Sequence, residues 1–354
     1  MIFIFVYSKN IHMASNILEG DTHIAMLSFN KDGTAQGVAK QRMIETLAKP
    51  EKRVINDPYA EKFTLGSGFL KFLGHNILVW MTKKLVPGFH EHLVSRTRFI
   101  DDLIEESVSN GIEQYVILGA GYDTRAHRLK LSASIKVFEV DQQEVQVRKR
   151  SKLPKKLSDS ENIIYVDIDF NHQSLKDRLI ESGYDQSKST VFTLEGVSQY
   201  VAKKAICSTI KELSDLSKKT NAIFYISYVS DMINKNPKAC FGKGYLNPEK
   251  KVSLIKKGVA KVGEPWISFY NDEEIEKILS ENGFSIIANK TLSDLNPLYF
   301  TPVDRTLSKD QIFNIEHSVV AKNSAKWDVI NEIFMSSGAK IFNFFIEKIY
   351  YSLE

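Results

Sequence analysis

Two closely spaced glycines and a downstream acid are the clearest chemical feature of this sequence. Gly119 and Gly121 follow a short apolar run, residues 115–118, whose β-branched and aromatic side chains are typical of a buried parallel strand. Glycine permits positive φ and leaves no Cβ between the backbone and a ligand. We therefore expect this loop to approach a phosphate- or sulfonium-type cofactor closely.

The acid is Asp141, which follows a second predicted strand, residues 135–140. In an open parallel sheet, an acid at that position lies beside the ribose of a nucleotide-like cofactor held by the glycine loop. Two later strand ends also carry acids, Asp169 and Glu195. Because ligands bind at the carboxyl ends of such strands, the three acids together predict a binding site.

The elements that would position these residues alternate between strand and helix. Predicted strands cover residues 115–118, 135–140, 162–166, 190–194 and 222–229, and helical patterns separate them. This order predicts an α/β fold with a doubly wound, Rossmann-like sheet. A further strand is expected at 284–289, and the last one, 313–321, is expected to close the sheet.

Three other regions surround this predicted domain, which we place at residues 35–324. Residues 35–110 are expected to form a helical lid, with a core or lid helix at 69–86 and a helix at 94–106. The lysine-rich segment 230–265 suggests a cap over the substrate. Residues 1–34 are an extension that begins at Met1 or at Met13, and 325–354 predict amphipathic helices that pack on the domain or form a homo-oligomer.

Composition excludes several classes of protein. The chain has 354 residues, 43% of them hydrophobic, which suffices for one large core or two modest ones. The net charge of +4 comes from interleaved rather than massed charges, so nucleic acid is not implied. Two distant cysteines, Cys207 and Cys240, indicate neither a disulfide framework nor a zinc site, and no stretch predicts a membrane span or an export signal. We expect a cytoplasmic protein.

Several motifs, taken in order, resemble the leucine carboxyl methyltransferase family, in particular its bacterial-type S-adenosylmethionine-dependent O-methyltransferases. The resemblance covers about residues 35–284, and LGAG-x-DTR, EVD and EGV-xx-Y form its most specific part. The matching stretches are NDPYAEKF, SRTRFIDD, VILGAGYDTRAHRL, VFEVDQQEVQVRKRSKL, VDIDF, TVFTLEGVSQYV and GEPWISF. The resemblance implies a class I methyltransferase fold with S-adenosyl-L-methionine as cofactor.

The family also implies roles for single residues. Arg96 corresponds to the arginine that binds the cofactor carboxylate, Gly119 lies against the methionine part, and Asp141 takes the ribose hydroxyls. Asp169 and Phe170 correspond to the adenine-contacting pair, with Asp167 as the alternative register; Glu195 lies near the methionine amino group, and Lys40 falls where eukaryotic members carry a cofactor-binding lysine. The residue after Glu195 differs from the eukaryotic enzymes, which argues against their phosphatase substrate.

The acceptor class decides whether the site needs a base. An acceptor carboxylate is already ionised at neutral pH, whereas a hydroxyl acceptor needs a proton acceptor. Glu195 and Tyr200 are the candidate catalytic residues, and His127 is more simply interpreted as a helix residue that is hydrogen-bonded locally. The acceptor, a small molecule or a peptide, is not specified by any of these residues.

Two other functions share part of this pattern. An NAD-dependent dehydrogenase would use the same loop and acid, but Thr124 replaces the third glycine of its fingerprint. A non-catalytic module with this fold could instead bind a partner through residues 235–261 and the C-terminal helix.

Three further features have structural alternatives. His90 and His92 are two apart on a predicted helix and should point in different directions, so we assign no metal to them. Trp266 and Tyr245 are equally compatible with an acceptor pocket and with ordinary packing.

Overall fold

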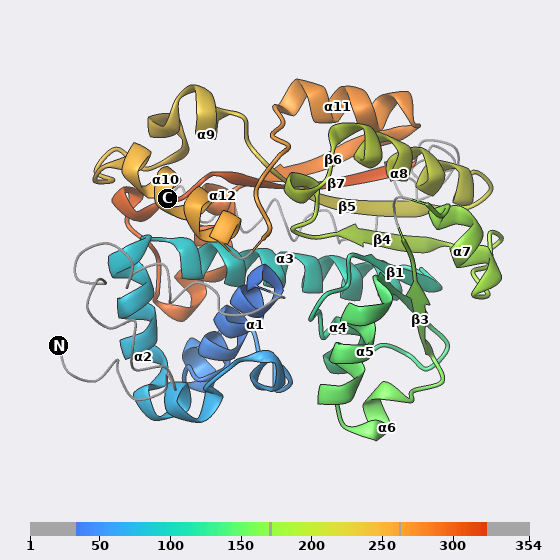
Figure 1. Cartoon of the computed structure of the whole chain (residues 1–354), viewed down its shortest axis with the longest axis horizontal. Helices are drawn as coiled ribbons and strands as arrows, with labels where there is room; N and C mark the ends of the chain where they lie inside the picture. Colours follow the sequence, from blue (N-terminus) through green and yellow to red (C-terminus); the bar gives the residue numbers. More distant parts are fainter. Residues whose placement is uncertain (1–32, 170–171, 262, 324–354) are drawn as a thin grey trace, which may run out of the picture.

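A single mixed sheet forms the centre of the molecule (Figure 1). The computed structural model describes residues 33–169, 172–261 and 263–323. Within them, seven strands have the order β3-β2-β1-β4-β5-β7-β6; β1 to β5 are parallel, and β7 is antiparallel to both of its neighbours. The strands are β1 (Gln114–Leu118), β2 (Lys136–Asp141), β3 (Ile163–Asp167), β4 (Thr190–Leu194), β5 (Ala222–Val229), β6 (Phe284–Lys290) and β7 (Glu316–Asn323).

Alternate residues of the central strands bury themselves in two different cores. Val116 and Leu118 of β1 pack in one cluster with helices α7, α8 and α11, whereas Tyr115 and Ile117 pack in another with α3. Every residue of β1 is buried, because successive side chains of a strand point to opposite faces and helices cover both. The predicted doubly wound α/β sheet is therefore confirmed.

Helices on both faces hold this sheet (Figure 1). Three long N-terminal helices, α1 to α3, lie on the side of the sheet that also carries α4 and α5, and α8 and α11 lie on the other. The helices are α1 (Gly33–Thr46), α2 (Ser67–Leu85), α3 (Phe89–Ser109), α4 (Arg125–Arg128), α5 (Gln143–Lys152), α6 (Lys155–Ser158), α7 (Leu175–Glu181), α8 (Lys203–Leu216), α9 (Met232–Lys235), α10 (Pro248–Lys261), α11 (Asp272–Glu281) and α12 (Leu292–Tyr299).

One expectation about the sheet is wrong, and two predicted helices are found with different bounds. The last strand does not close the sheet: β7 lies between β5 and β6, so β6 is the edge strand. The helix expected at 94–106 begins earlier, at Phe89, and ends at Ser109. The helix expected at 69–86 is α2, and exposures of 57%, 85% and 59% for Phe69, Phe72 and Trp80 favour the lid alternative over the core one.

Some expectations fall outside the described part of the chain. Residues 1–32 and 324–354 lie outside the described residues. The start at Met1 or Met13, and an oligomer formed through the C-terminal helices, therefore stay predictions. Among the residues that the structure describes, none of the helices is both long and apolar enough to cross a membrane.

Candidate functional site

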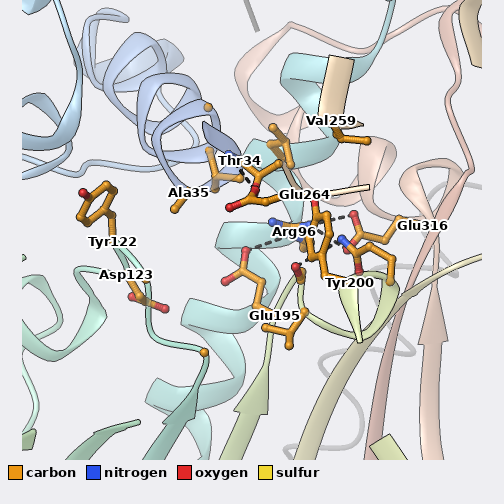
Figure 2. A pocket seen from close by; sticks show the side chains of 18 of the residues that line it. Thr34, Ala35, Arg96, Tyr122, Asp123, Glu195, Tyr200, Val259, Glu264 and Glu316 are labelled. Carbon is orange, nitrogen blue, oxygen red and sulfur yellow. Dashed lines mark hydrogen bonds and ion pairs between the residues drawn. The ribbon is translucent and has the colours of Figure 1, made fainter. Parts of the chain in front are cut away.

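A cavity of about 480 Å³ lies where β1, β2 and β4 end. The glycine loop after β1 and Asp141 at the end of β2 line it, together with residues of α1, α3 and α10. Figure 2 shows the side chains of Arg96 and Glu195 between Asp123 on one side and Tyr200 on the other. The edge of the sheet at which the sequence predicts a binding site therefore contains a cavity.

The glycine loop requires glycine at Gly119. This residue has a φ of 65°, and a Cβ added there would lie 2.5 Å from Cγ2 of Val197, which is too close for any real contact. Gly121 also has positive φ, 42°. The loop therefore turns sharply and leaves its backbone bare beside the cavity.

Asp141 is fixed to this loop by hydrogen bonds. Its Oδ2 accepts the backbone N–H of Gly121 at 2.6 Å, and its Oδ1 accepts that of Gln142 at 2.7 Å. Burial raises the pKa of Asp141, although these two hydrogen bonds and nearby basic side chains act in the opposite direction. A carboxylate with remaining acceptor capacity therefore lies in the cavity at a defined position.

Glu195, directly after β4, is bound by two arginines. Its Oε1 accepts Nε–H of Arg96 at 2.9 Å, and its Oε2 accepts Nη1–H of Arg125 at 2.6 Å. Burial opposes the ionisation of Glu195, but the charges of Arg125 and Arg96 outweigh it and lower its pKa. Glu195 is therefore a stable anion and a weak base.

Arg96 connects this pair to a second buried acid, Glu316 of β7. Its Nη1 lies 2.7 Å from each oxygen of Glu316, and Nε2 of His92 lies 2.7 Å from Oε2 of the same carboxylate. Arg96 is 4% exposed and Glu316 is 6% exposed. The hydrogen bonds of Arg96 to these two acids use its Nε and Nη1, and the residue also lines the cavity.

The far side of the cavity is more apolar and contains Tyr200 and Glu264. Glu264 accepts hydrogen bonds from the backbone N–H and the hydroxyl of Thr34, which ties α1 to the segment after α10. Burial raises the pKa of Tyr200. The apolar lining on this side comes from Val197, Val201, Val229, Ile255, Val259, Trp266, Phe313 and Ile315.

The structure brings together most of the residues that the sequence predicted for the site. Arg96, Gly119, Asp141, Glu195 and Tyr200 all line the cavity. Trp266 lines it too, whereas Tyr245 is buried elsewhere and donates its hydroxyl to the carbonyl of Pro87. Lys40 of α1 is not among the lining residues.

The predicted adenine contacts are separate from this group. Asp169 follows β3, its side chain is 52% exposed, and it lies 2.7 Å from Nδ1 of His172. The alternative, Asp167, accepts a hydrogen bond from Nη2 of Arg178 at 2.8 Å. Neither is among the described residues that line the cavity, and Phe170 lies outside the described residues.

The histidines behave differently from one another. His90 contacts Glu45 and His92 contacts Glu316, so the two do point apart, as predicted. His127 is not hydrogen-bonded locally as expected: within the described chain, neither ring nitrogen has a hydrogen-bond partner. Burial lowers the pKa of His127 to about 4.

Sequence reasoning missed Glu316, Arg125 and Glu264. Arg125 stands in the DTR motif beside the glycine loop, so its position was a usable signal. Glu316 gave none, because it reaches Arg96 only through the antiparallel pairing of β7 with β5, which sets it opposite Val229. Glu264 follows a helix far along the chain and contacts Thr34 only in the folded molecule.

A family model and a curated relative both match this chain to methyltransferases. The sequence model described as "Leucine carboxyl methyltransferase" matches residues 35–214, which include the glycine loop, Asp141 and Glu195. A protein of Bacillus subtilis (strain 168) named "Putative S-adenosyl-L-methionine-dependent methyltransferase YktD" is 30% identical over 228 residues, 64% of this chain and 71% of its own.

Two further matches are more distant or shorter. A protein of Mycolicibacterium gilvum (strain PYR-GCK), named "Putative S-adenosyl-L-methionine-dependent methyltransferase", is 31% identical over 207 residues, 53% of this chain and 65% of its own. This chain thus spans slightly less than two thirds of that relative. A solved structure from Thermobifida fusca YX, described as "a putative methyltransferase", covers 80% of this chain and 94% of its own at 15% identity, with a TM-score of 0.49.

Proposed function

This chain belongs to the leucine carboxyl methyltransferase family and is an S-adenosyl-L-methionine-dependent methyltransferase, and we propose that it methylates an oxygen of a small-molecule or peptide acceptor. The resemblance in its motifs is thereby confirmed at the level of the family. The observation that carries the proposal is the continuous cavity, which joins the glycine loop and Asp141 to the apolar wall beside Tyr200.

The residues present fit the groups of S-adenosyl-L-methionine. We propose that Asp141 accepts hydrogen bonds from the ribose hydroxyls, because its carboxylate is fixed in the cavity by Gly121. The guanidinium of Arg96, which lines the cavity, suits the α-carboxylate, and the anionic Glu195 suits the α-ammonium group. The bare backbone at Gly119 leaves room for the methionine part. Asp169 and Phe170 remain our candidates for the adenine.

The protein's contribution to the reaction would be position and exclusion of water. When bound, S-adenosyl-L-methionine supplies an electrophilic methyl group on a sulfonium; the acceptor oxygen forms the new bond to carbon, and the electron pair of the broken carbon–sulfur bond stays on sulfur. Side chains from α1 and α10 would cover this reaction, with the clasp between Glu264 and Thr34 holding the two segments together. No metal or redox group is needed in this account.

Of the two acceptor classes, the site favours a carboxylate with an apolar body. Glu195 is a weak base because Arg125 and Arg96 stabilise its anion, and Tyr200 resists ionisation because it is buried. A carboxylate acceptor needs neither, since it is ionised at neutral pH. The apolar wall, with Trp266 and Phe313, would bind the rest of the acceptor.

Calorimetric titration with S-adenosyl-L-methionine and with NADH tests the cofactor assignment. We expect the wild type to bind only the first, and Asp141→Ala to lower that affinity at least about 100-fold, because a hydrogen bond to a charged group contributes roughly 1.5–3 kcal/mol and two are lost. Asp159→Ala is the matched control, since this aspartate is 62% exposed beside Arg150. Equal affinity of Asp141→Ala and wild type would disprove the role of Asp141, and binding of NADH alone would indicate a dehydrogenase.

The acceptor is tested by methylation of a panel of carboxylic acids and phenols matched in their apolar part. A carboxylate acceptor should be methylated at a rate that is flat with pH above about 5, because the acceptor is already ionised. A hydroxyl acceptor should react faster as pH rises. Binding of the cofactor without transfer to any acceptor of either class would favour a non-catalytic module.

A further inference from the structure

One group of potential metal ligands lies outside the cavity, among the three N-terminal helices. Glu45 of α1, His75 of α2 and His90 of α3 each bring one ligand atom to a common point, and these atoms all lie within 4.8 Å of one another. Glu45 and His90 are 0% and 1% exposed, and the side chain of His75 is 12% exposed. None of the three lines the cavity described above.

Both ring nitrogens of His90 face polar side chains. Nδ1 lies 2.8 Å from the side-chain amide of Gln41, and Nε2 lies 3.0 Å from Oε2 of Glu45. With the amide oxygen of Gln41 toward Nδ1, that nitrogen carries the proton and Nε2 has a lone pair for a metal ion. With the amide turned by 180°, Gln41 donates to Nδ1 and Nε2 carries a proton toward Glu45, which is the metal-free alternative.

His75 directs a second imidazole at the same oxygen. Its Nε2 lies 3.5 Å from Oε2 of Glu45 and is buried without a hydrogen-bond partner among the described residues. His75 follows a break in α2 at Gly74, which has a φ of 75° and a ψ of 169°. A Cβ at Gly74 would meet nothing within 4 Å, so the glycine serves the backbone conformation and not close packing.

Arg305 orients the carboxylate without blocking it completely. Its Nη1 lies 2.7 Å from Oε1 of Glu45 and its Nη2 lies 3.0 Å from Oε2, while the backbone N–H of Val54 also binds Oε1. Each carboxylate oxygen has two lone pairs, so Oε2 retains one toward the imidazoles. The guanidinium repels a further cation, so we expect the affinity of the site to be moderate.

From these contacts we propose that Glu45, His75 and His90 bind one divalent transition-metal ion, with zinc the best fit. Two imidazole nitrogens and one carboxylate oxygen are a ligand set that Zn²⁺ accepts in tetrahedral geometry, with the fourth position left for a water molecule. Gln41 would fix the tautomer of His90 from the other side of the ring. The ion would join α1, α2 and α3.

The test is a titration of the full chain, freed of metal by a chelator, with ZnCl₂ followed by calorimetry, and with CoCl₂ followed by visible absorption. We expect one site, with the intense absorption typical of four-coordinate Co²⁺. His75→Asn and His90→Gln should each lower zinc affinity at least tenfold, because each removes one of three ligands. His172→Asn is the matched control, since this exposed histidine lies 2.7 Å from the carboxylate of Asp169 and belongs to no group of three potential metal ligands among the described residues.

His75→Asn is the decisive variant, because His75 reaches solvent and its replacement should leave the fold intact, which circular dichroism and the melting temperature check. His90 is buried, so loss of zinc binding in His90→Gln supports the proposal only if this variant folds. Zinc should also raise the melting temperature of the wild type and not that of His75→Asn. Absence of saturable zinc binding overturns the proposal and leaves the hydrogen bond between His90 and Glu45 as the metal-free arrangement. Equal zinc affinity in wild type and His75→Asn also overturns it, since binding through His12 or His23 would give that result.

Discussion

The two sides of the cofactor cavity are built in different ways. On one side, a hydrogen bond joins Gly121, in the loop after β1, to Asp141 at the end of the adjacent parallel strand β2, within a short stretch of chain. On the other side, Arg96, Glu195 and Glu316 come from α3, the end of β4 and the start of β7, and they are held by buried ion pairs. The first side depends on backbone geometry, and the second depends on charge balance across the whole fold.

This difference predicts unequal responses to the same chemical change. Replacing a carboxylate by its amide removes the charge and keeps the shape. On the Glu316 side the change leaves buried Arg96 with one fewer counter-charge, whereas on the Asp141 side it removes a charge that burial already disfavours. The predictions below compare the two sides, beginning with the largest effect.

Glu316→Gln is expected to lower the free energy of unfolding by about 4 kcal/mol at neutral pH, because breaking a buried ion pair typically costs 3–5 kcal/mol. Denaturant titration measures the change. Glu144→Gln is the control: this carboxylate also faces an arginine, Arg148, but it is 88% exposed, and its loss should cost less than about 1 kcal/mol. Equal costs for the two variants would contradict the idea that charge balance holds this side.

The same carboxylate predicts a pH dependence of stability. Burial opposes the ionisation of Glu316, but Arg96 and His92 outweigh it and lower its pKa to about 2, from an ordinary value of 4.5. A lowered pKa in the folded state means that the stabilisation is complete above about pH 4.5 and is lost as pH falls toward 2. The loss should reach about 3 kcal/mol, since one pKa unit corresponds to 1.36 kcal/mol.

Urea titrations between pH 5 and pH 2.5 measure this dependence. The wild type should lose stability more steeply over this range than Glu316→Gln, which lacks the titrating group. Parallel curves for the two proteins would mean that Glu316 has an ordinary pKa in the folded state.

The comparison also explains how much of the site the sequence could predict. Gly119, Gly121 and Asp141 are recognisable because a strand, a turn and the next strand end fix them locally. Glu195 is recognisable as a strand-end acid and Arg96 through the SRTRFIDD motif, but their direct ion pair is not, because it depends on how α3 packs against the end of β4. The role of Glu316 cannot be predicted from local sequence, because the insertion of β7 between β5 and β6 depends on pairing across the whole domain.

Gly119→Ala should test the backbone side with a smaller effect. The added Cβ meets Cγ2 of Val197 at 2.5 Å and stands at a φ of 65°, so we expect a loss of about 2 kcal/mol in stability and a tenfold or greater loss in cofactor affinity. Gly111→Ala is the matched control, because Gly111 has a φ of 90° but open space around it. The double variant Gly119→Ala/Val197→Ala removes the collision. It should regain most of the stability that Gly119→Ala loses beyond the loss in Gly111→Ala. If it does not, backbone strain alone is responsible for the loss.

The smallest effect on stability is expected from Asp141→Asn, the counterpart of Glu316→Gln. The amide oxygen can still accept the N–H of Gly121, and the N–H of Gln142, which is at the surface, can turn to water. Because burial raises the pKa of Asp141, removing its charge relieves part of a desolvation cost, and we expect a change in unfolding free energy below about 1 kcal/mol. Cofactor affinity should nevertheless fall, because an amide is a weaker acceptor for the ribose hydroxyls than a carboxylate. Calorimetry and denaturant titration on the same sample separate the two quantities, and a destabilisation as large as that of Glu316→Gln would remove the distinction between the two sides.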